Sequence, residues 1–202
     1  MNQFTSKNYI EKLYAGWYGK IIGVRYGAYV EGWSYERLEK VFGEMTTYLY
    51  NYKNFAADDD TNGPIFFVRA LEDYTPTREI TAEQMGLTAL NYAPDEHGFF
   101  WWGESTEHAA YLNLKAGIMA PHSGSVEQNG SSAAEQIGGQ IFSDVWGFVN
   151  PGKPYIAAEY AEKMASVTHV NLNAHFSYYN SLKWHFSKSH SLVLVHSHGM
   201  FL

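Results

Sequence analysis

Apolar side chains recur every three or four residues through most of the chain, and polar capping residues separate these stretches. This spacing places the apolar side chains on one face of an α-helix, so the pattern predicts a series of amphipathic helices. The predicted helices span 6–24, 34–44, 58–73, 81–92, 105–115, 132–146 and 154–167. Apart from a short candidate at 192–195, no alternating strand pattern remains. The sequence therefore predicts an all-α fold.

Helix-start signals support these boundaries. Thr81 with Gln84 and Ser132 with Glu135 have the spacing of a capping box, in which two side chains satisfy free backbone groups of the first turn. Pro154 is expected at the first position of the last predicted helix, where a missing N–H costs nothing. We also expect the 58–73 helix to tolerate a proline in its first turn.

Composition limits the class of protein. The chain has 202 residues, which fits one domain, and its formal net charge of −7 argues against a nucleic-acid partner. It contains no cysteine, which excludes a disulfide scaffold, a thiolate zinc site and a cysteine nucleophile. No stretch reaches the roughly 18 apolar residues of a membrane span, and no signal peptide is recognisable. We therefore expect a cytoplasmic protein without a membrane partner.

Three adjacent carboxylates, Asp58, Asp59 and Asp60, precede Thr61. Their mutual repulsion needs compensation, and two interpretations provide it. The free N–H groups and the dipole of a helix N-terminus stabilise acidic side chains. A hard cation such as Mg²⁺ or Mn²⁺ prefers carboxylate and hydroxyl oxygens as ligands. The motif alone leaves both interpretations open, and helix capping is the commoner one.

A second candidate is a stripe of glycines followed by an acid. The glycines are Gly16, Gly19, Gly23 and Gly27. Intervals of three and four residues place them on one side of a helix, which indicates close packing against a neighbour. Glu31 follows, next to another glycine that suggests a turn. Its carboxylate is expected either to face a cleft or to be solvated.

Two further segments contain possible ligand contacts. The run 98–104 places four aromatic residues, including Trp101 and Trp102, between two glycines. We expect these side chains either to line a pocket that stacks on a flat ligand group or to pack under a loop. The polar loop 123–130 ends in Asn129 and Gly130 and precedes a predicted helix. It is either an ordinary connection or a binding loop for phosphate or hydroxyl groups.

In this order and combination, the motifs resemble the ADP-ribosylglycohydrolase family, and most closely its bacterial branch with a DDDTN metal motif. The resemblance covers about residues 8–170. It rests on GWYGKIIG at 16–23, the glycine at 27, EG at 31–32, DDDTN at 58–62, STE at 105–107, the loop 123–130, EQIGGQIF at 135–142 and SVTH at 166–169.

The resemblance implies a multi-helix bundle with a dinuclear Mg²⁺ or Mn²⁺ centre that hydrolyses the glycosidic bond of an ADP-ribosyl group. It implies Asp58, Asp59 and Asp60 as metal ligands with Thr61 in support, although Asp58 stands where the family usually has threonine. Glu31 and Asp60 are the implied catalytic residues, and Glu31 would orient or deprotonate water.

The resemblance also implies a class of substrate and the residues that contact it. It implies an ADP-ribosylated protein or small molecule as the partner. The expected contacts in the substrate cleft are Trp101, Trp102, Asn129 and Gly130.

The C-terminal part departs from the family pattern. The family carries a second acidic cluster that completes the metal site, whereas no Asp or Glu follows Glu162 in this sequence. Six of the nine histidines lie at His169 or later. We therefore expect a family-like domain at 1–170 and an atypical tail at 171–202, as in a truncated or frame-shifted chain. Such a chain is expected to bind metal weakly and to show little activity.

Two other functions stay open at this point. A degenerate copy of the scaffold can serve as a non-catalytic binding or structural protein. A related enzyme can instead cleave an N-glycosidic bond in a nucleoside or sugar conjugate. The motifs do not fix the leaving group, the metal or the oligomeric state.

Overall fold

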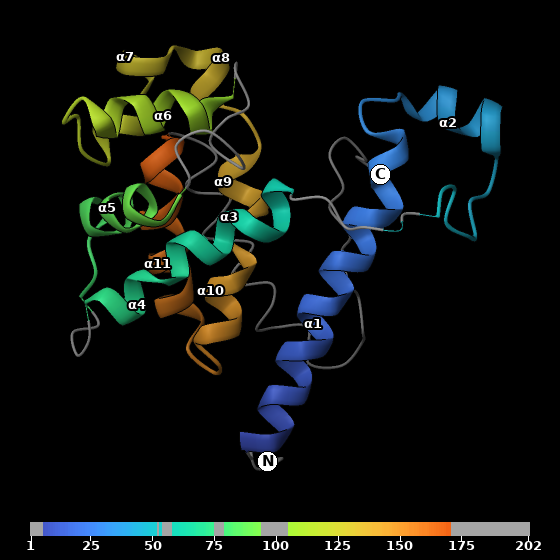
Figure 1. Ribbon diagram of the computed structural model, residues 1–202, viewed down its shortest axis with the longest axis horizontal. Helices are drawn as coiled ribbons and strands as arrows, with labels where there is room; N and C mark the ends of the chain where they lie inside the picture. Colours follow the sequence, from blue (N-terminus) through green and yellow to red (C-terminus); the bar gives the residue numbers. More distant parts are fainter. Residues whose placement is uncertain (1–5, 52, 54–57, 75–78, 94–104, 171–202) are drawn as a thin grey trace. The chain divides into compact units, whose positions relative to one another are not determined.

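The computed structural model describes residues 6–51, 53, 58–74, 79–93 and 105–170 (Figure 1). Helices make up all the regular secondary structure in these ranges, which confirms the all-α prediction. The tail at 171–202, with its strand candidate at 192–195, lies outside the described residues. Among the helices of the described ranges, none is both long enough and apolar enough to cross a membrane.

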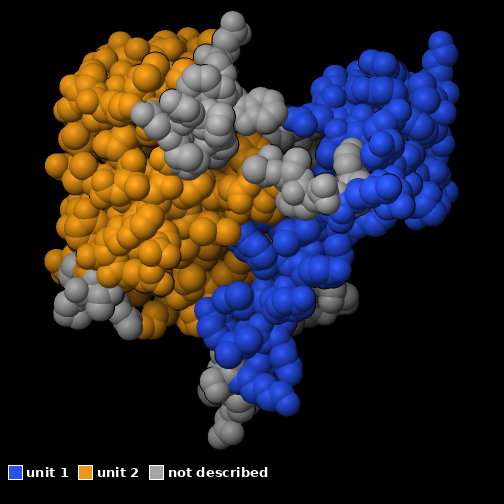
Figure 2. Space-filling view, in the orientation of Figure 1, with its two compact units in different colours: residues 1–56, 191–202 blue, residues 57–190 orange. Residues whose placement is uncertain are grey.

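The described residues fall into two compact units, which meet in the sequence near residue 57 (Figure 2). The first unit contains α1 (Ser6–Gly27), the 3-10 helix η1 (Ala28–Val30) and α2 (Tyr35–Phe42). The second unit contains α3 (Asp59–Val68), α4 (Ala70–Asp73), α5 (Ala82–Tyr92), α6 (Thr106–Lys115), the 3-10 helix η3 (His122–Gly124), α7 (Val126–Asn129), α8 (Ser131–Ala134), α9 (Gly138–Ile141), α10 (Asp144–Val149) and α11 (Pro154–Thr168).

In the first unit, α1 contains the predicted glycine stripe. Gly16, Gly19 and Gly23 lie within its 22 residues, and the helix ends at Gly27. Gly23 and Gly27 are buried, whereas Gly16 and Gly19 are partly exposed. The burial therefore fits the close-packing prediction at the C-terminal end of the stripe.

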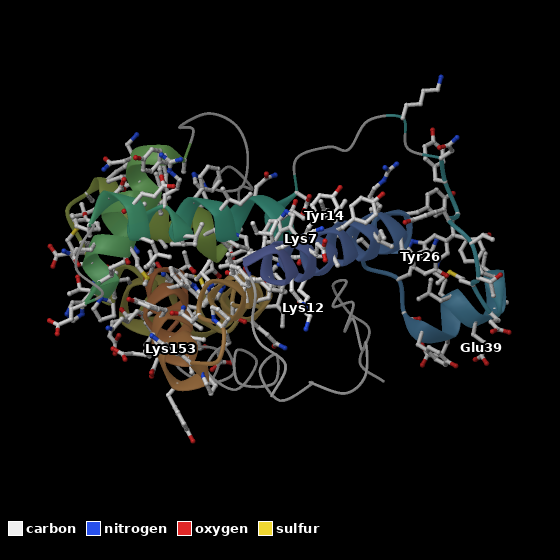
Figure 3. The ribbon with its side chains drawn as sticks, turned by 90° about the horizontal axis from the view of Figure 1, so that it is seen from below. Lys7, Lys12, Tyr14, Tyr26, Glu39 and Lys153 are labelled. Carbon is white, nitrogen blue, oxygen red and sulfur yellow. The ribbon has the colours of Figure 1, made fainter. Side chains whose placement is uncertain are left out.

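Side-chain hydrogen bonds fix the start of α2 and the segment that follows it. Ser34 caps α2 as predicted, because its hydroxyl oxygen accepts the Arg37 backbone N–H at 3.3 Å. Tyr26, labelled in Figure 3, lies near the C-terminal end of α1. It donates its hydroxyl proton to the Met45 carbonyl oxygen. This bond ties the segment after α2 back to α1.

In the second unit, α11 is the central helix and packs against α5, α6, α9 and α10 (Figure 1). Its buried face contains Ala157, Ala158, Ala161 and Ala165. These small side chains let the surrounding helices approach closely, because the distance between helix axes follows the side chains at the contact. Larger groups fill the remaining space: Trp146 of α10 stacks on Tyr160, with ring centroids 5.2 Å apart.

Local capping signals predicted several helix starts correctly. The capping box of α5 is present, with Gln84 N donating to Thr81 Oγ1 at 3.1 Å and Thr81 N donating to Gln84 Oε1 at 2.9 Å. Ser105 Oγ accepts the His108 backbone N–H at 3.1 Å at the start of α6. Pro154 occupies the first turn of α11. In each case the signal acts within one helical turn, so it does not depend on the rest of the fold.

The predicted helix at 132–146 was wrong. The chain instead forms three short helices, α8, α9 and α10, and Ser132 lies inside α8 rather than at a cap. Gly138 and Gly139 lie within α9 and are buried. Glycine is a poor helix former, and tertiary contacts at these two positions decide the path of the backbone.

The predicted helix at 58–73 is divided. It breaks at Arg69 into α3 and α4. Pro64 is the sixth residue of α3 rather than a first-turn residue, so the prediction for it was wrong by one turn. Since proline has no N–H, Pro64 cannot donate the usual helical hydrogen bond to the Asp60 carbonyl oxygen.

Candidate metal centre

The three aspartates lie at the N-terminus of α3, where Asp58 is the N-cap residue. Asp58 has an extended backbone, and its Oδ1 atom accepts the Thr61 backbone N–H at 2.8 Å. Its Oδ2 atom accepts the Thr61 hydroxyl proton. Asp59 Oδ1 accepts the Asp60 backbone N–H at 3.0 Å. First-turn N–H groups therefore stabilise two of the three carboxylates, as the capping interpretation predicted.

The same turn gathers oxygen atoms suited to a cation. One carboxylate oxygen from each of Asp58, Asp59 and Asp60 lies within 4.8 Å of the other two. Asp60 is only 6% exposed, and the other two residues are half-buried. A carboxylate oxygen has two lone pairs, so accepting one N–H leaves another lone pair for a metal. This donor set fits a hard cation such as Mg²⁺ or Mn²⁺.

Two polar neighbours hold Asp58 in place. Thr61 is buried and donates both its backbone N–H and its hydroxyl proton to the Asp58 carboxylate. Asn62 donates a side-chain N–H to the Asp58 carbonyl oxygen at 2.8 Å. Thr61 therefore orients the Asp58 carboxylate, while its own role as a metal ligand stays a prediction.

Glu31 lies in the other compact unit. It directly follows η1, and its side chain is exposed. The aspartate cluster belongs to the second unit, so the pairing of Glu31 with the aspartates stays a prediction. Trp101 and Trp102, which were expected in the substrate cleft, lie outside the described residues.

The polar loop 123–130 is folded into helical turns. It contains the end of η3 and all of α7, and Ser125 caps α7 by accepting the Gln128 N–H at 3.4 Å. Asn129 is the last residue of α7. Gly130 follows with φ of +76°, a left-handed conformation that favours glycine. The two predicted substrate contacts are therefore adjacent at the start of α8, and their contact with a substrate stays a prediction.

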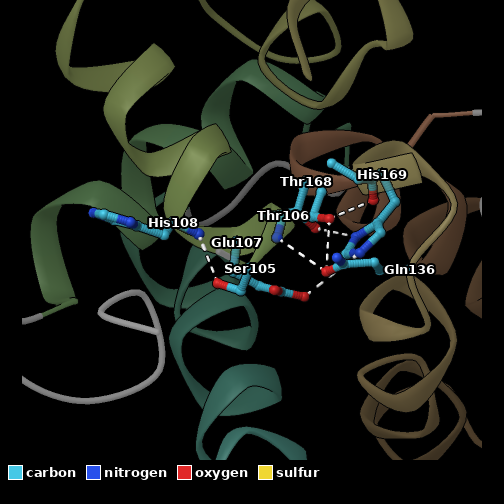
Figure 4. A network of polar contacts seen from close by, with 8 residues as sticks. Ser105, Thr106, Glu107, His108, Gln136, Thr168 and His169 are labelled. Atoms are coloured by element: carbon cyan, nitrogen blue, oxygen red, sulfur yellow. Dashed lines mark hydrogen bonds and ion pairs between the residues drawn. The ribbon is translucent and has the colours of Figure 1, made fainter. Parts of the chain in front are cut away.

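Glu107 and His169 form a buried polar pair to which the sequence assigned no role (Figure 4). Glu107 Oε1 lies 3.5 Å from His169 Nε2, and the two side chains are 9% and 0% exposed. Thr168 Oγ1 lies 2.7 Å from His169 Nδ1, on the other side of the ring. Because Glu107 is in the first turn of α6 and His169 directly follows α11, the pair joins these two helices.

Gly138 of α9 leaves room for this pair. A Cβ atom on Gly138 would lie 1.9 Å from Glu107 Oε1 and 2.6 Å from His169 Cε1. Beside it, Gln136 Oε1 accepts the Thr106 backbone N–H at 3.1 Å, which connects the segment before α9 to α6 (Figure 4). Two consecutive glycines at 138–139 are a sequence signal that could have indicated close packing of another side chain against this segment. They do not identify Glu107 or His169 as that side chain.

Comparison with known proteins gives one result. The ADP-ribosylglycohydrolase family model matches residues 5–177, which is most of the chain. The chain belongs to the ADP-ribosylglycohydrolase family. The match confirms the family that the motifs resembled, and it includes both Glu31 and the aspartate cluster. No curated protein and no solved structure matches the chain.

Burial keeps His169 of this ADP-ribosylglycohydrolase family member uncharged. Desolvation lowers the pKa of His169 to about 3. A neutral ring has one N–H. With the proton on Nε2 it would face Glu107 Oε1 at 3.5 Å, and Nδ1 would accept the Thr168 hydroxyl proton at 2.7 Å. The Nε2 contact is longer than an ordinary N–H···O bond, so most of the ring's orientation comes from Thr168 and from packing.

The stability of the fold is expected to decrease as the pH falls from about 6.5 towards 3. In this range the unfolded chain binds a proton at residue 169 and the native chain does not, because the pKa is about 3 in the fold against 6.5 ordinarily. The free energy of unfolding should fall by up to about 1.4 kcal/mol per pH unit from this residue. Thermal unfolding between neutral pH and mildly acidic pH measures the slope.

Two variants identify the source of this pH dependence. His169→Gln removes the titrating group, so its stability should depend less steeply on pH than that of the unaltered chain. His122→Gln changes an exposed histidine and should keep the full slope. If His169→Gln keeps the full slope as well, the pH dependence comes from other groups.

Proposed function

We propose that this chain is a metal-dependent hydrolase that cleaves the glycosidic bond of ADP-ribosyl groups. The observation that carries the proposal is the convergence of the Asp58, Asp59 and Asp60 carboxylates at the start of α3 in a member of the ADP-ribosylglycohydrolase family. Backbone N–H groups already orient the carboxylates of Asp58 and Asp59. These two side chains would therefore need little rearrangement to bind a divalent cation.

Asp58, Asp59 and Asp60 would hold Mg²⁺ or Mn²⁺, with Thr61 supporting them. When bound, such ions orient ribose hydroxyl groups and lower the pKa of bound water. The protein itself orients the carboxylates before the metal binds. Backbone N–H groups in the first turn of α3 hold the carboxylates of Asp58 and Asp59, and the Thr61 hydroxyl also holds that of Asp58. Little rearrangement is then needed when substrate arrives.

Glu31 and Asp60 are proposed as the catalytic carboxylates. Glu31 takes a proton from the attacking water, and Asp60 orients that water. A bond forms between the water oxygen and C1 of the ribose while the bond from C1 to the leaving nitrogen or oxygen breaks. The leaving group receives the proton, so charge and atoms balance without a redox partner.

The proposed substrates are ADP-ribosylated proteins or small molecules, for example arginine or serine conjugates. Trp101 and Trp102 are proposed to stack on a flat group of the substrate, as aromatic side chains commonly do in ligand sites. Asn129 and Gly130 are proposed to border the same cleft at the start of α8.

We further propose that this chain alone binds its metal weakly and turns over slowly. All three proposed aspartate ligands come from one turn of one helix, which supplies ligands from a single direction. Residues 163–202 contain no aspartate or glutamate, so they add no carboxylate ligand to the three aspartates.

Release of ADP-ribose from ADP-ribosyl-arginine and ADP-ribosyl-serine tests the proposal. We expect slow release that requires Mn²⁺, stops with a chelator and disappears in Glu31→Ala. Glu39→Ala, which changes an exposed glutamate of α2, is the matched control and should keep the wild-type rate (Figure 3). Thermal stabilisation by ADP-ribose without any release would contradict the enzyme and favour a binding protein on the same scaffold.

A further inference from the structure

Asn113, Ser123 and Asn129 form a closed ring of hydrogen bonds at the base of the loop 123–130. Asn113 Nδ2 donates to the Ser123 carbonyl oxygen at 2.9 Å and to Asn129 Oδ1 at 2.8 Å. Asn129 Nδ2 donates to the same carbonyl oxygen at 2.8 Å. Since a carbonyl oxygen only accepts, both amide nitrogens must face Ser123, and this requirement fixes the orientation of both side-chain amides.

Ser123 anchors the ring to the core of the second unit. It is fully buried, and its hydroxyl donates to the Val167 carbonyl oxygen at 2.7 Å, near the end of α11. Its backbone N–H donates to the Met119 carbonyl oxygen at 3.2 Å. Asn113 belongs to α6. The ring therefore fixes the two ends of the loop to each other and to two long helices of the unit.

The ring uses half of the hydrogen-bonding capacity of the Asn129 side chain. One of its two amide hydrogens and one of the two lone pairs on Oδ1 are used by Ser123 and Asn113. The remaining amide hydrogen and the remaining Oδ1 lone pair can bind a ligand only in the directions set by the fixed orientation of the Asn129 amide. The next residue, Gly130, leaves α7 in a left-handed conformation and begins the turn into α8.

We propose that Asn113 is a positioning residue, which acts through Asn129 on Gly130 and the start of α8. This inference rests on the proposed function for the identity of the ligand, because that function assigns Asn129 and Gly130 to the substrate. Asn113 itself does not touch substrate. Its role is to order the loop before binding, and ordering a loop in advance improves affinity more than the rate of the chemical step.

Asn113→Asp tests the role directly. The substitution replaces both N–H donors with a carboxylate that faces two oxygen acceptors, Asn129 Oδ1 and the Ser123 carbonyl. Amide hydrogen exchange in residues 126–131 should accelerate by about tenfold. The KM for ADP-ribosyl-arginine in the presence of Mn²⁺ should rise by about tenfold, while kcat changes by less than about threefold.

Asn150→Asp is the matched control. Asn150 also donates a side-chain N–H to a backbone carbonyl oxygen, that of Trp146 at 3.0 Å, but at the end of α10. We expect it to leave exchange in 126–131 and the KM unchanged. Asn113→Ala is the second variant, since it removes the donors without adding a charge and should show the same local pattern more weakly.

The outcomes separate this inference from the proposed function. Unchanged exchange in 126–131, or faster exchange spread evenly over the second unit, overturns the positioning role. A fall in kcat at constant KM also overturns it. If the wild-type chain releases no ADP-ribose, the proposed enzyme fails, and the exchange measurement still decides whether Asn113 orders the loop.

Discussion

Asp58→Asn is expected to reduce Mn²⁺ affinity on the order of 100-fold while leaving α3 folded. Asparagine is as good an N-cap as aspartate, so the new side chain can still accept the Thr61 N–H that Asp58 accepts at 2.8 Å. The lost negative charge weakens the electrostatic attraction for a divalent cation. A loss of about 2.7 kcal/mol corresponds to 100-fold, because each 1.36 kcal/mol is about tenfold. Isothermal titration with Mn²⁺ and metal-stimulated release of ADP-ribose measure the effect.

Two further variants separate capping from metal binding. Asp58→Ala removes both functions, so it should lose Mn²⁺ affinity and in addition about 1 kcal/mol of stability. Asp73→Asn is the matched control, because Asp73 accepts side-chain hydrogen bonds from Thr88 and Tyr92 at 2.9 Å each and lies outside the aspartate cluster. Wild-type Mn²⁺ affinity in Asp58→Asn would mean that capping is the whole role of this carboxylate.

The aspartate cluster was predictable because its members are adjacent in the sequence. A helix start brings consecutive side chains to one turn whatever the rest of the fold does, as Asp58 and Thr61 show. The Glu107–His169 pair was not predictable in the same way. Its members lie on α6 and after α11, and only the packing of those helices brings them within 3.5 Å.

The same distinction explains the errors in the predicted helices. Starts that depend on one turn, such as Thr81 and Ser105, were correct. The helix predicted at 132–146 failed because Gly138 lies against Glu107 and His169, which are far from it in the sequence. The predicted capping box of Ser132 with Glu135 was wrong as well, although it too spans a single turn: Ser132 lies inside α8, and Glu135 is the residue that follows this helix.

Gly124→Ala is expected to destabilise the second unit by about 3 kcal/mol, at the upper end of the usual cost of overpacking. A Cβ atom there would lie 2.6 Å from the Thr168 carbonyl carbon, 2.7 Å from the His169 backbone nitrogen and 2.9 Å from the Ser166 carbonyl oxygen. All three are backbone atoms at the end of α11, so no side-chain rotation can relieve the contact. The expected fall in Tm is about 6–12 °C for a chain of this size.

Gly139→Ala is the control that isolates this backbone contact. Gly139 is also buried, but its added Cβ would meet the side-chain atoms Ala165 Cβ at 3.2 Å and His169 Cβ at 3.4 Å, so the expected loss is about 1 kcal/mol or less. Because Ser123 precedes Gly124 and holds the hydrogen-bond ring, Gly124→Ala should also accelerate amide exchange in 126–131, whereas Gly139→Ala should not. Equal Tm values for the two variants would mean that the loop is not held against α11 as closely as these distances require.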